Sequence, residues 1–406
     1  MRFSIIIPTQ DRPALLAVAV KHAMQLHHSD FEVIVSDNST NSDFRRLNAD
    51  AMCNYSAARN FRWVGPPRCL SPPEHFEFAL DFATGDYIVY LTDKMVVLPD
   101  ALSDIESILR TSGADIVNWP YAQYLIDDIG NPSGSGTLVV ESEFLKGQPQ
   151  SYDPNAALRF KASCIVSRDK QHTRDYALGK IVFGCYSKEL IDRIRAVSGT
   201  VFGGATHDYS AMVQALSLAR TCVMLNIYEI VFISLPSDQS LGSLTAANSQ
   251  SALRYFRSFT DGESILSSLP VPGLYASQHN MVAHDYRKFL PLYGNTLAFN
   301  ETNWLAAIYA ELTSESKVWL DSAEMTAQLK LFKHHVGQAG QRFPLMLKRS
   351  RNRIAANAER FWRPVSSLIN SRVFGRQNAP LAQTVVVTSL DDAIRHVSRR
   401  CRRCSV

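Results

Sequence analysis

Two carboxylates, a lysine and a histidine stand at positions of this sequence where chemistry is expected. Asp93 follows the apolar run 87–91, which is typical of a buried strand, and Lys94 comes directly after it. Asp208 follows His207 and precedes an apolar helical stretch. Ligands bind at the carboxyl ends of strands in open α/β sheets, so Asp93 is the first candidate for a functional group.

Short apolar runs alternate with helical patterns and must position these residues. The expected strands are 3–7, 31–35, 61–64, 87–91, 114–119 and 222–235, and the expected helices are 15–26, 74–82 and 102–111. Such alternation predicts βαβ units and an α/β fold with a mostly parallel sheet flanked by helices. Thr9, Asp37 and Asp93 should then meet at one edge of the sheet, because each follows a strand.

The composition is that of an ordinary globular protein. The 406 residues are 46% hydrophobic and 20% charged, and the net charge of +4 does not indicate a nucleic-acid partner. Seven scattered cysteines favour a reducing compartment over a disulfide framework. The N-terminus has no signal-peptide pattern and no run reaches about 18 apolar residues, so we expect a cytoplasmic protein, at most peripheral to the inner face of the membrane.

We expect two regions in the chain. Residues 1–250 carry the α/β pattern, whereas residues 251–406 have a mainly helical pattern and end in a basic tail. Basic residues from Arg342 onward, near Phe343 and Trp362, favour contact with an anionic membrane surface. Binding of an anionic polysaccharide and an ordinary solvated helix face are the alternatives.

Several segments together resemble a known family. They are Ile5-Ile6-Ile7-Pro8-Thr9-Gln10-Asp11-Arg12, Val33-Ile34-Val35-Ser36-Asp37-Asn38-Ser39, Ala83-Thr84-Gly85-Asp86-Tyr87 and the stretch from Leu91 to Pro99. In order and spacing they resemble the family 2 inverting glycosyltransferases of the GT-A fold, over residues 3–235. The resemblance implies a Rossmann-like catalytic domain at 1–250, a nucleotide-sugar donor that is UDP-linked by default, and a glycan or lipid-linked acceptor in cell-surface glycan or polysaccharide synthesis.

The resemblance also assigns the residues that bind the donor. They are Pro8, Thr9, Asp11, Arg12, Asp37, Asp93 and Lys94. Pro8, Thr9 and Asp37 would cradle the nucleoside, and a carboxylate can accept from a base N–H or a ribose hydroxyl. The alternative is that Asp37 only shapes a polar turn after its strand.

The diphosphate site departs from the family pattern, which has two or more acidic residues where this chain has Thr92-Asp93-Lys94-Met95. Those acids hold Mg²⁺ or Mn²⁺ against the diphosphate. In one interpretation Asp93 binds the ion with His207, water and the diphosphate. In a second, Lys94 replaces the metal as the counter-charge. In a third, Lys94 is a solvated loop residue at a decayed site, which leaves a non-catalytic sugar-nucleotide or glycan-binding protein as the alternative function.

Attack of an acceptor hydroxyl on an anomeric carbon needs a general base, which in the family is an acidic residue at the head of a helix. Asp208 fits that position, and Gly203 and Gly204 ahead of it let the backbone approach a ligand closely. His207 is the second choice, because the ordinary pKa of histidine lies at about 6.5. Alternatively, Asp208 caps the helix that follows or complements the charge of its N-terminus.

Four aromatic residues are candidates for stacking on a sugar ring, although such residues more often pack in a core. They are Trp119, Tyr121, Tyr124 and Trp304. A sugar nucleotidylyltransferase is the competing enzyme class, but its Gly-rich N-terminal phosphate loop is absent, since no glycine precedes Gly65.

Overall fold

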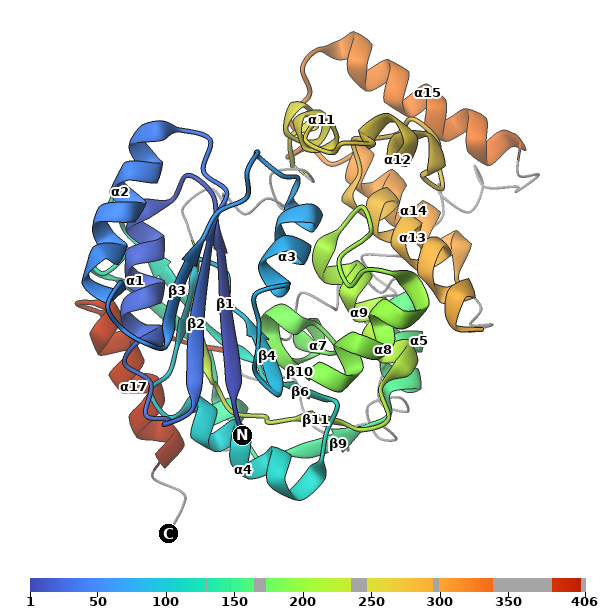
Figure 1. Cartoon of the computed structure of the whole chain (residues 1–406). Coiled ribbons are helices and arrows are strands. Elements are labelled where there is room, and N and C mark those ends of the chain that lie inside the picture. Colours follow the sequence, from blue (N-terminus) through green and yellow to red (C-terminus); the bar gives the residue numbers. More distant parts are fainter. Residues whose placement is uncertain are drawn as a thin grey trace.

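The computed structural model describes residues 1–128, 130–145, 147–163, 173–234, 247–294, 299–338 and 382–402. Figure 1 shows an α/β body with a helical region at one corner; β1 to β4 run side by side in the body, and α1 and α2 lie along one side of them. The expected fold class, a mostly parallel sheet flanked by helices with a mainly helical C-terminal region, is confirmed.

An eight-stranded sheet carries most of the core. Across the sheet its strands are β3 (Phe61–Val64), β2 (Phe31–Asp37), β1 (Phe3–Thr9), β4 (Tyr87–Tyr90), β10 (Gly184–Ser187), β6 (Ile116–Asn118), β11 (Cys222–Met224) and β9 (Gln150–Tyr152). Strand β1 is parallel to both β2 and β4, and every one of its residues is buried, as in a sheet covered on both faces. The register pairs Thr9 with Asp37, so β1 and β2 end together at one edge.

The helices begin at ordinary start signals of the sequence. They are α1 (Pro13–Ala23), α2 (Ser42–Met52), α3 (Pro72–Leu80), α4 (Ala101–Ser112), α5 (Pro154–Ala162), α7 (Thr173–Ala177), α8 (Lys188–Ser198), α9 (His207–Leu218), α11 (Ser249–Arg257), α12 (Gly262–Ser268), α13 (Gln278–Phe289), α14 (Glu301–Leu312), α15 (Ser322–Gln338) and α17 (Leu390–Arg402). Helix α3, for example, starts with a capping box formed by Ser71 and Glu74. The helix expected over 102–111 is α4, which ends at Gly113 in a left-handed conformation.

A second, five-stranded sheet completes the body. Its order is β13 (Ala382–Val387), β8 (Gly136–Glu141), β7 (Tyr121–Ile126), β12 (Ile230–Ser234) and β5 (Met95–Val97). The strand region expected over 222–235 contains two strands, because the chain turns at Asn226, whose φ is 58°, and passes from β11 in the first sheet to β12 in the second.

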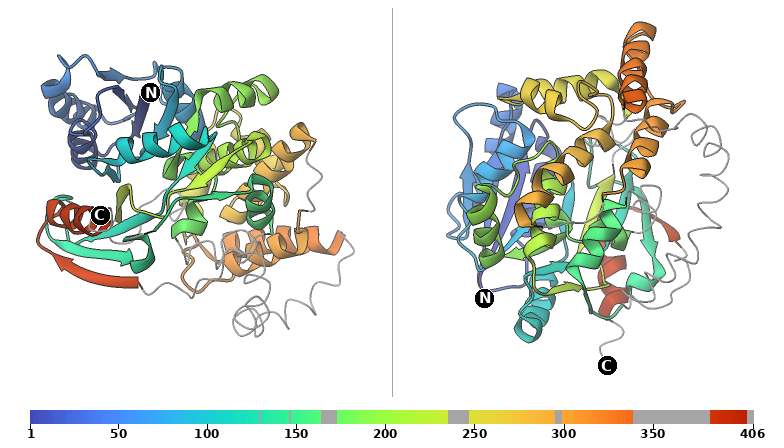
Figure 2. Two further views of the ribbon diagram at one scale, coloured as in Figure 1. Left: turned by 90° about the horizontal axis from the view of Figure 1, so that it is seen from below. Right: turned by 90° about the vertical axis from the view of Figure 1, so that its right-hand side faces the viewer.

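The C-terminal strand β13 returns to the body, where it pairs antiparallel with β8 (Figure 2). The division at residue 250 stays a prediction; the helices α11 to α15 follow it, and β13 beyond them pairs with a strand that precedes it. No described helix combines the length and the apolar composition needed to cross a bilayer. Arg342, Phe343 and Trp362 lie outside the described residues, so the expected membrane contact stays a prediction.

Gly85 lies where β4 enters the sheet beside β1. A Cβ atom on this residue would lie 2.6 Å from the backbone nitrogen of Ser4 and 2.9 Å from the carbonyl oxygen of Arg2. The N–H of Gly85 donates to Ser4 Oγ at 2.8 Å, and that hydroxyl donates to Glu32 Oε1 at 2.6 Å. This close approach of two backbones requires a residue without a side chain.

We therefore expect Gly85→Ala to lower the free energy of unfolding by about 1–3 kcal/mol, the usual cost of forcing a methyl group into a packed site. Urea denaturation measures the change. Gly337→Ala in α15 is the matched control, because a Cβ atom there meets nothing within 4 Å and alanine is the better helix former. Unchanged stability of Gly85→Ala would contradict the close packing.

Candidate active site

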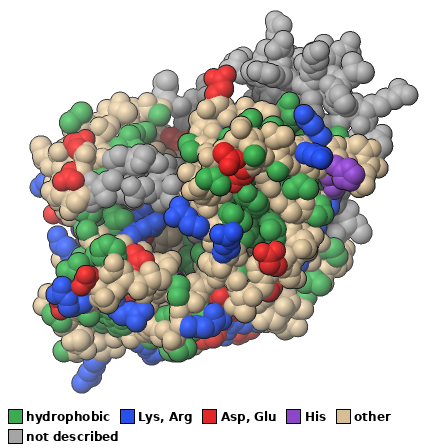
Figure 3. All heavy atoms as spheres, turned by 90° about the horizontal axis from the view of Figure 1, so that it is seen from above, with side chains coloured by type: hydrophobic (Ala, Val, Ile, Leu, Met, Phe, Trp, Pro, Cys, Tyr) green, Lys and Arg blue, Asp and Glu red, His purple; other side chains and the backbone are tan. Residues whose placement is uncertain are grey.

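A cavity of about 470 Å³ opens at the carboxyl ends of β1 and β4. Figure 3 views this end of the molecule and shows Lys and Arg side chains gathered around a hollow. Of the expected site residues, the following line the cavity: Pro8, Thr9, Arg12, Asp93, Lys94, His207 and Asp208. Segments that are far apart in the sequence thus converge on one site, which is where open α/β sheets bind ligands.

Asp93 is held by two side chains from the end of β1. Thr9 Oγ1 donates to Asp93 Oδ2 at 3.0 Å, and Arg12 Nη1 lies 3.3 Å from Asp93 Oδ1. The carboxylate is almost fully buried, whereas the Arg12 side chain keeps 34% of its surface exposed. The guanidinium therefore brings positive charge to the cavity wall beside Asp93.

Lys94 is buried, with 5% of its surface exposed. Its Nζ lies 4.8 Å from the ring centroid of Phe232 on β12, a cation–π contact, and both residues line the cavity. The backbone of Lys94 is fixed as well, since its carbonyl accepts from the N–H of Ile233 at 2.7 Å. The interpretation of Lys94 as a solvated loop residue is therefore wrong.

The residues around Asp93 do not fit a metal ion held by several protein ligands. Divalent cations such as Mg²⁺ need hard oxygen ligands, but the Asp93 carboxylate already faces the Arg12 guanidinium, and Lys94 adds a second cation at the next position. In the part of the chain that the structure describes, no three His, Cys, Asp or Glu side chains are grouped to hold a metal. The other expected ligand, His207, packs against Phe76 with ring centroids 4.2 Å apart.

The carboxylates of Asp11 and Asp37 hold the chain that follows β2. Asp37 accepts from the N–H of Ser39 at 2.9 Å and from Asn48 Nδ2 at 3.2 Å. Asp11 accepts from the N–H and the hydroxyl of Thr40 at 3.0 and 2.8 Å. Asp11 and Asp37 are not among the described residues that line the cavity. This arrangement fits the polar-turn alternative, and a nucleoside contact by either carboxylate stays a prediction.

Asp208 lies in the first turn of α9 and forms an ion pair with a buried lysine. Lys180 Nζ lies 3.0 Å from Asp208 Oδ2; the Lys180 side chain is fully buried, and 19% of the Asp208 side chain is exposed. The ammonium lies 3.7 Å from the ring centroid of Tyr176 and 3.9 Å from that of Tyr209. The N-cap residue of α9 is Thr206, so Asp208 is not the cap.

Burial and charge act in opposite directions on Asp208. Burial raises the pKa of this carboxyl. The ammonium of Lys180, together with His207, lowers the same pKa by more, so the net pKa lies below its ordinary value. The carboxylate is therefore ionised at neutral pH and can accept a proton from the cavity. Burial lowers the pKa of His207, whose Nδ1 has no hydrogen-bond partner among the described residues. Asp208 is the better candidate for the base.

Lys180 is the functional residue that the sequence reasoning missed. It lies 28 positions before Asp208, between the apolar residues Leu178 and Ile181. A lysine inside an apolar stretch was the available signal, since lysine is almost never fully buried unless it is paired.

The four aromatic candidates for sugar stacking do not share one environment. Trp119, Tyr124 and Trp304 are core residues, with 1%, 0% and 4% of their surface exposed. The expectation that these three stack on a sugar ring is therefore wrong. Tyr121, in contrast, lines the cavity and is partly exposed.

Comparisons with known proteins connect the first part of the chain to one family. Residues 4–169 match the family model described as Glycosyl transferase family 2. The chain is 27% identical over 154 residues to GalNAc(5)-diNAcBac-PP-undecaprenol beta-1,3-glucosyltransferase of Campylobacter jejuni subsp. jejuni. The aligned segment covers 36% of this chain and 46% of that protein. The chain is 29% identical over 105 residues to Protein CgeD of Bacillus subtilis, which covers 25% of each. The chain thus spans less than half the length of these curated relatives.

Among solved structures, the chain is similar to S. aureus TarS. A TarS structure in complex with UDP-GlcNAc has 12% sequence identity and a TM-score of 0.45, and the likeness covers 84% of this chain and 93% of that one. The family match includes Thr9, Asp37 and Asp93 but ends before Lys180 and Asp208. The expected resemblance is confirmed over residues 4–169, which match the model of glycosyl transferase family 2.

Proposed function

We propose that the chain is an inverting glycosyltransferase that moves a sugar from a nucleotide sugar, UDP-linked by default, to an acceptor hydroxyl. The observation that carries the proposal is that Asp93, Lys94 and Asp208 line one cavity at the carboxyl edge of a family 2 domain. The Campylobacter jejuni relative is named after an undecaprenol-linked glycan. That name supports a glycan or lipid-linked acceptor, in cell-surface glycan or polysaccharide synthesis.

The proposed reaction uses the charges on the cavity wall. Asp208 takes the proton of the acceptor hydroxyl while the oxygen forms a bond to the anomeric carbon from the face opposite the nucleotide. The bond from that carbon to the diphosphate oxygen breaks, and its electron pair leaves with the nucleoside diphosphate. Arg12 and Lys94 stabilise the negative charge that develops there. Inversion at the anomeric carbon follows from attack on the opposite face.

The ion pair with Lys180 gives Asp208 two properties that a base needs here. The ammonium keeps the buried carboxylate ionised, and the contact with Oδ2 orients the side chain. The second carboxylate oxygen can then face the acceptor.

Asp208→Asn should lower kcat by about a hundredfold or more, because the amide cannot accept the proton of the acceptor hydroxyl. Donor binding should be spared, and titration of the protein with UDP by calorimetry checks that. Asp192→Asn is the matched control, since that carboxylate is 56% exposed and pairs with Lys188 on α8. Transfer by Asp208→Asn at near the wild-type rate would remove this residue from the mechanism.

Lys180→Met should move the acid limb of the kcat/KM profile to higher pH. The base must be ionised, so activity falls as the pH drops through its pKa. Without the ammonium, burial raises that pKa against the opposing effects of His207 and a backbone hydrogen bond only. Lys161→Met is the matched control: Lys161 is also buried and also contacts Tyr176, but it donates to the carbonyl of that residue at 3.2 Å. An acid limb at the same pH in Lys180→Met and the wild type would contradict the tuning role.

Lys94→Ala should reduce turnover by about tenfold to a thousandfold if the lysine is the counter-charge of the diphosphate, while a chelator leaves wild-type turnover unchanged. Lys317→Ala is the control, since this lysine is also buried over an aromatic ring, 5.3 Å from the centroid of Trp319. Strict dependence on a divalent cation, with an active Lys94→Ala variant, would instead support a metal bound by Asp93. Saturable UDP binding without transfer or donor hydrolysis would favour the non-catalytic binding protein.

A further inference from the structure

The loop that carries His207 and Asp208 into the cavity is bound by side chains from the helical region after residue 250. Tyr255 on α11 donates its hydroxyl to the carbonyl of Ala205 at 2.6 Å, and Lys288 on α13 donates to the carbonyl of Gly203 at 2.6 Å. Figure 1 shows α13 beside α9, the helix that this loop begins. Every one of these bonds reaches the main chain of residues 203–206.

Asp285, also on α13, makes the strongest of these contacts. Its Oδ1 accepts from the N–H of Ala205 at 2.6 Å, and its Oδ2 accepts from the N–H and the hydroxyl of Thr206, the former at 2.8 Å. The carboxylate is fully buried, and His284 Nδ1 lies 3.0 Å from Oδ1. A buried carboxylate that accepts backbone N–H groups forms charge-assisted bonds, which are about twice as strong as neutral ones.

Gly204 explains how the carboxylate comes so close. A Cβ atom at this position would lie 2.4 Å from Asp285 Oδ1 and 2.7 Å from Oδ2. The sequence predicted that this glycine lets the backbone approach a ligand. In the structure, the group that occupies this space is the side chain of Asp285.

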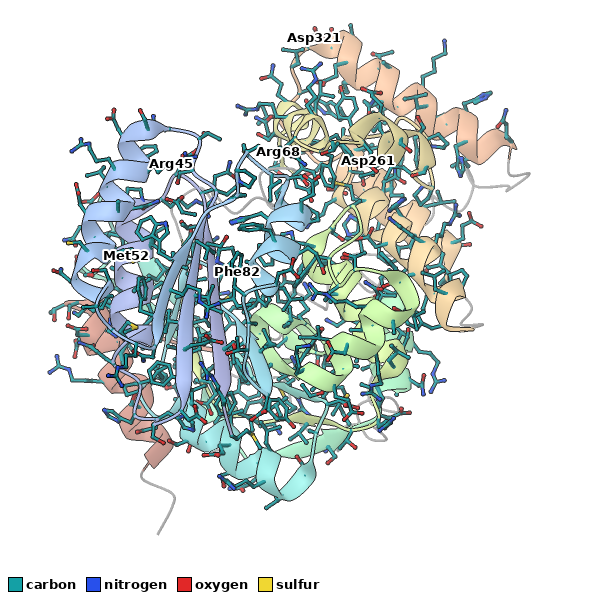
Figure 4. All side chains as sticks on the ribbon, viewed as in Figure 1. Arg45, Met52, Arg68, Phe82, Asp261 and Asp321 are labelled. Atoms are coloured by element: carbon teal, nitrogen blue, oxygen red, sulfur yellow. The ribbon has the colours of Figure 1, made fainter. Side chains whose placement is uncertain are left out.

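The other end of the same loop is bound from the family 2 domain. Glu77 on α3 accepts from the N–H groups of Val201 and Phe202 at 2.8 and 2.9 Å, and Arg195 donates to it at 2.7 Å. The two parts also meet where Arg68, which is labelled with Asp261 in Figure 4, donates to Thr260 at 3.3 Å.

We propose that Asp285 is a positioning residue, through which the helical region after residue 250 fixes the turn that aims Asp208 at the acceptor. The inference rests on the proposed function, because it assumes that Asp208 is the base. Two carboxylates, the partly exposed Glu77 and the buried Asp285, hold the two ends of the base-bearing loop, and only the first belongs to the family match. The helical region thereby becomes part of the catalytic unit.

The consequence for catalysis follows from geometry. A base must lie within hydrogen-bond reach of the hydroxyl, and a displacement of about 1 Å can cost about a hundredfold in rate. Asp285→Asn keeps the shape of the side chain but replaces one acceptor oxygen with an N–H₂ donor that faces backbone N–H groups. The loop then loses at least one of its bonds, while the donor residues Arg12 and Lys94 are untouched.

The test compares Asp285→Asn with Asp115→Asn in the full chain. Asp115 is also buried and also accepts a backbone N–H, from Arg220 at 2.7 Å, but it does not touch the loop 203–208. We expect Asp285→Asn to lower kcat about tenfold to a hundredfold with unchanged affinity for UDP. Amide hydrogen exchange in peptides that cover 203–209 should become faster in this variant only. Asp115→Asn should keep both the wild-type kcat and the wild-type exchange of those peptides.

The outcomes separate this inference from the proposed function. If the wild type transfers no sugar, the proposed function fails, and exchange in 203–209 still decides whether Asp285 fixes the turn. If the wild type is active, an Asp285→Asn variant with wild-type kcat and exchange overturns the inference and leaves the proposed function intact. Should Asp285→Asn not fold, Lys288→Met replaces it in the test, because the exposed side chain of Lys288 binds the same loop. Amide exchange in 203–209 should be faster in Lys288→Met than in the wild type. Wild-type exchange in these peptides would overturn the inference.

Discussion

The ion pair between Asp208 and Lys180 is the interaction on which the rest of the site depends. A carboxylate taken out of water is costly unless an opposite charge and hydrogen bonds compensate it. Lys180 supplies that charge: its Nζ lies 3.0 Å from Asp208 Oδ2, and its side chain has no exposed surface. The rings of Tyr176 and Tyr209 cover its ammonium. Without the lysine, the pKa of Asp208 would be higher, so the carboxylate would be ionised over a narrower pH range.

The charged side chains of the cavity come from two parts of the fold. Arg12 and Lys94 lie on the side where β1 and β4 end, and Asp208 lies on the side formed by α9. A donor with a negative diphosphate matches the first side, and a neutral hydroxyl that must lose a proton matches the second. Because Asp93 is paired with Arg12, the carboxylate that a metal site would use instead holds a cation in place.

The helical region adds to this site rather than standing apart from it. Tyr255 and Gln278, from α11 and α13, line the same cavity as Thr9 and Asp93. The family match ends at residue 169, so these residues, like Asp208, belong to the part of the chain that the match does not describe. Elements outside the matched segment therefore line part of the cavity, and loops and added helices on a shared fold commonly set specificity.

Local sequence patterns were sufficient to locate β1, β2, β4 and the head of α9, because a buried strand and a helix head leave local signals: an apolar run before Asp93, and an apolar helical stretch after Asp208. The folded chain was needed to show that Lys180 pairs with Asp208 and that Asp285 binds the loop before it. Those contacts join residues 28 and about 80 positions apart, and no local periodicity encodes which distant side chain meets which backbone group once the core has packed.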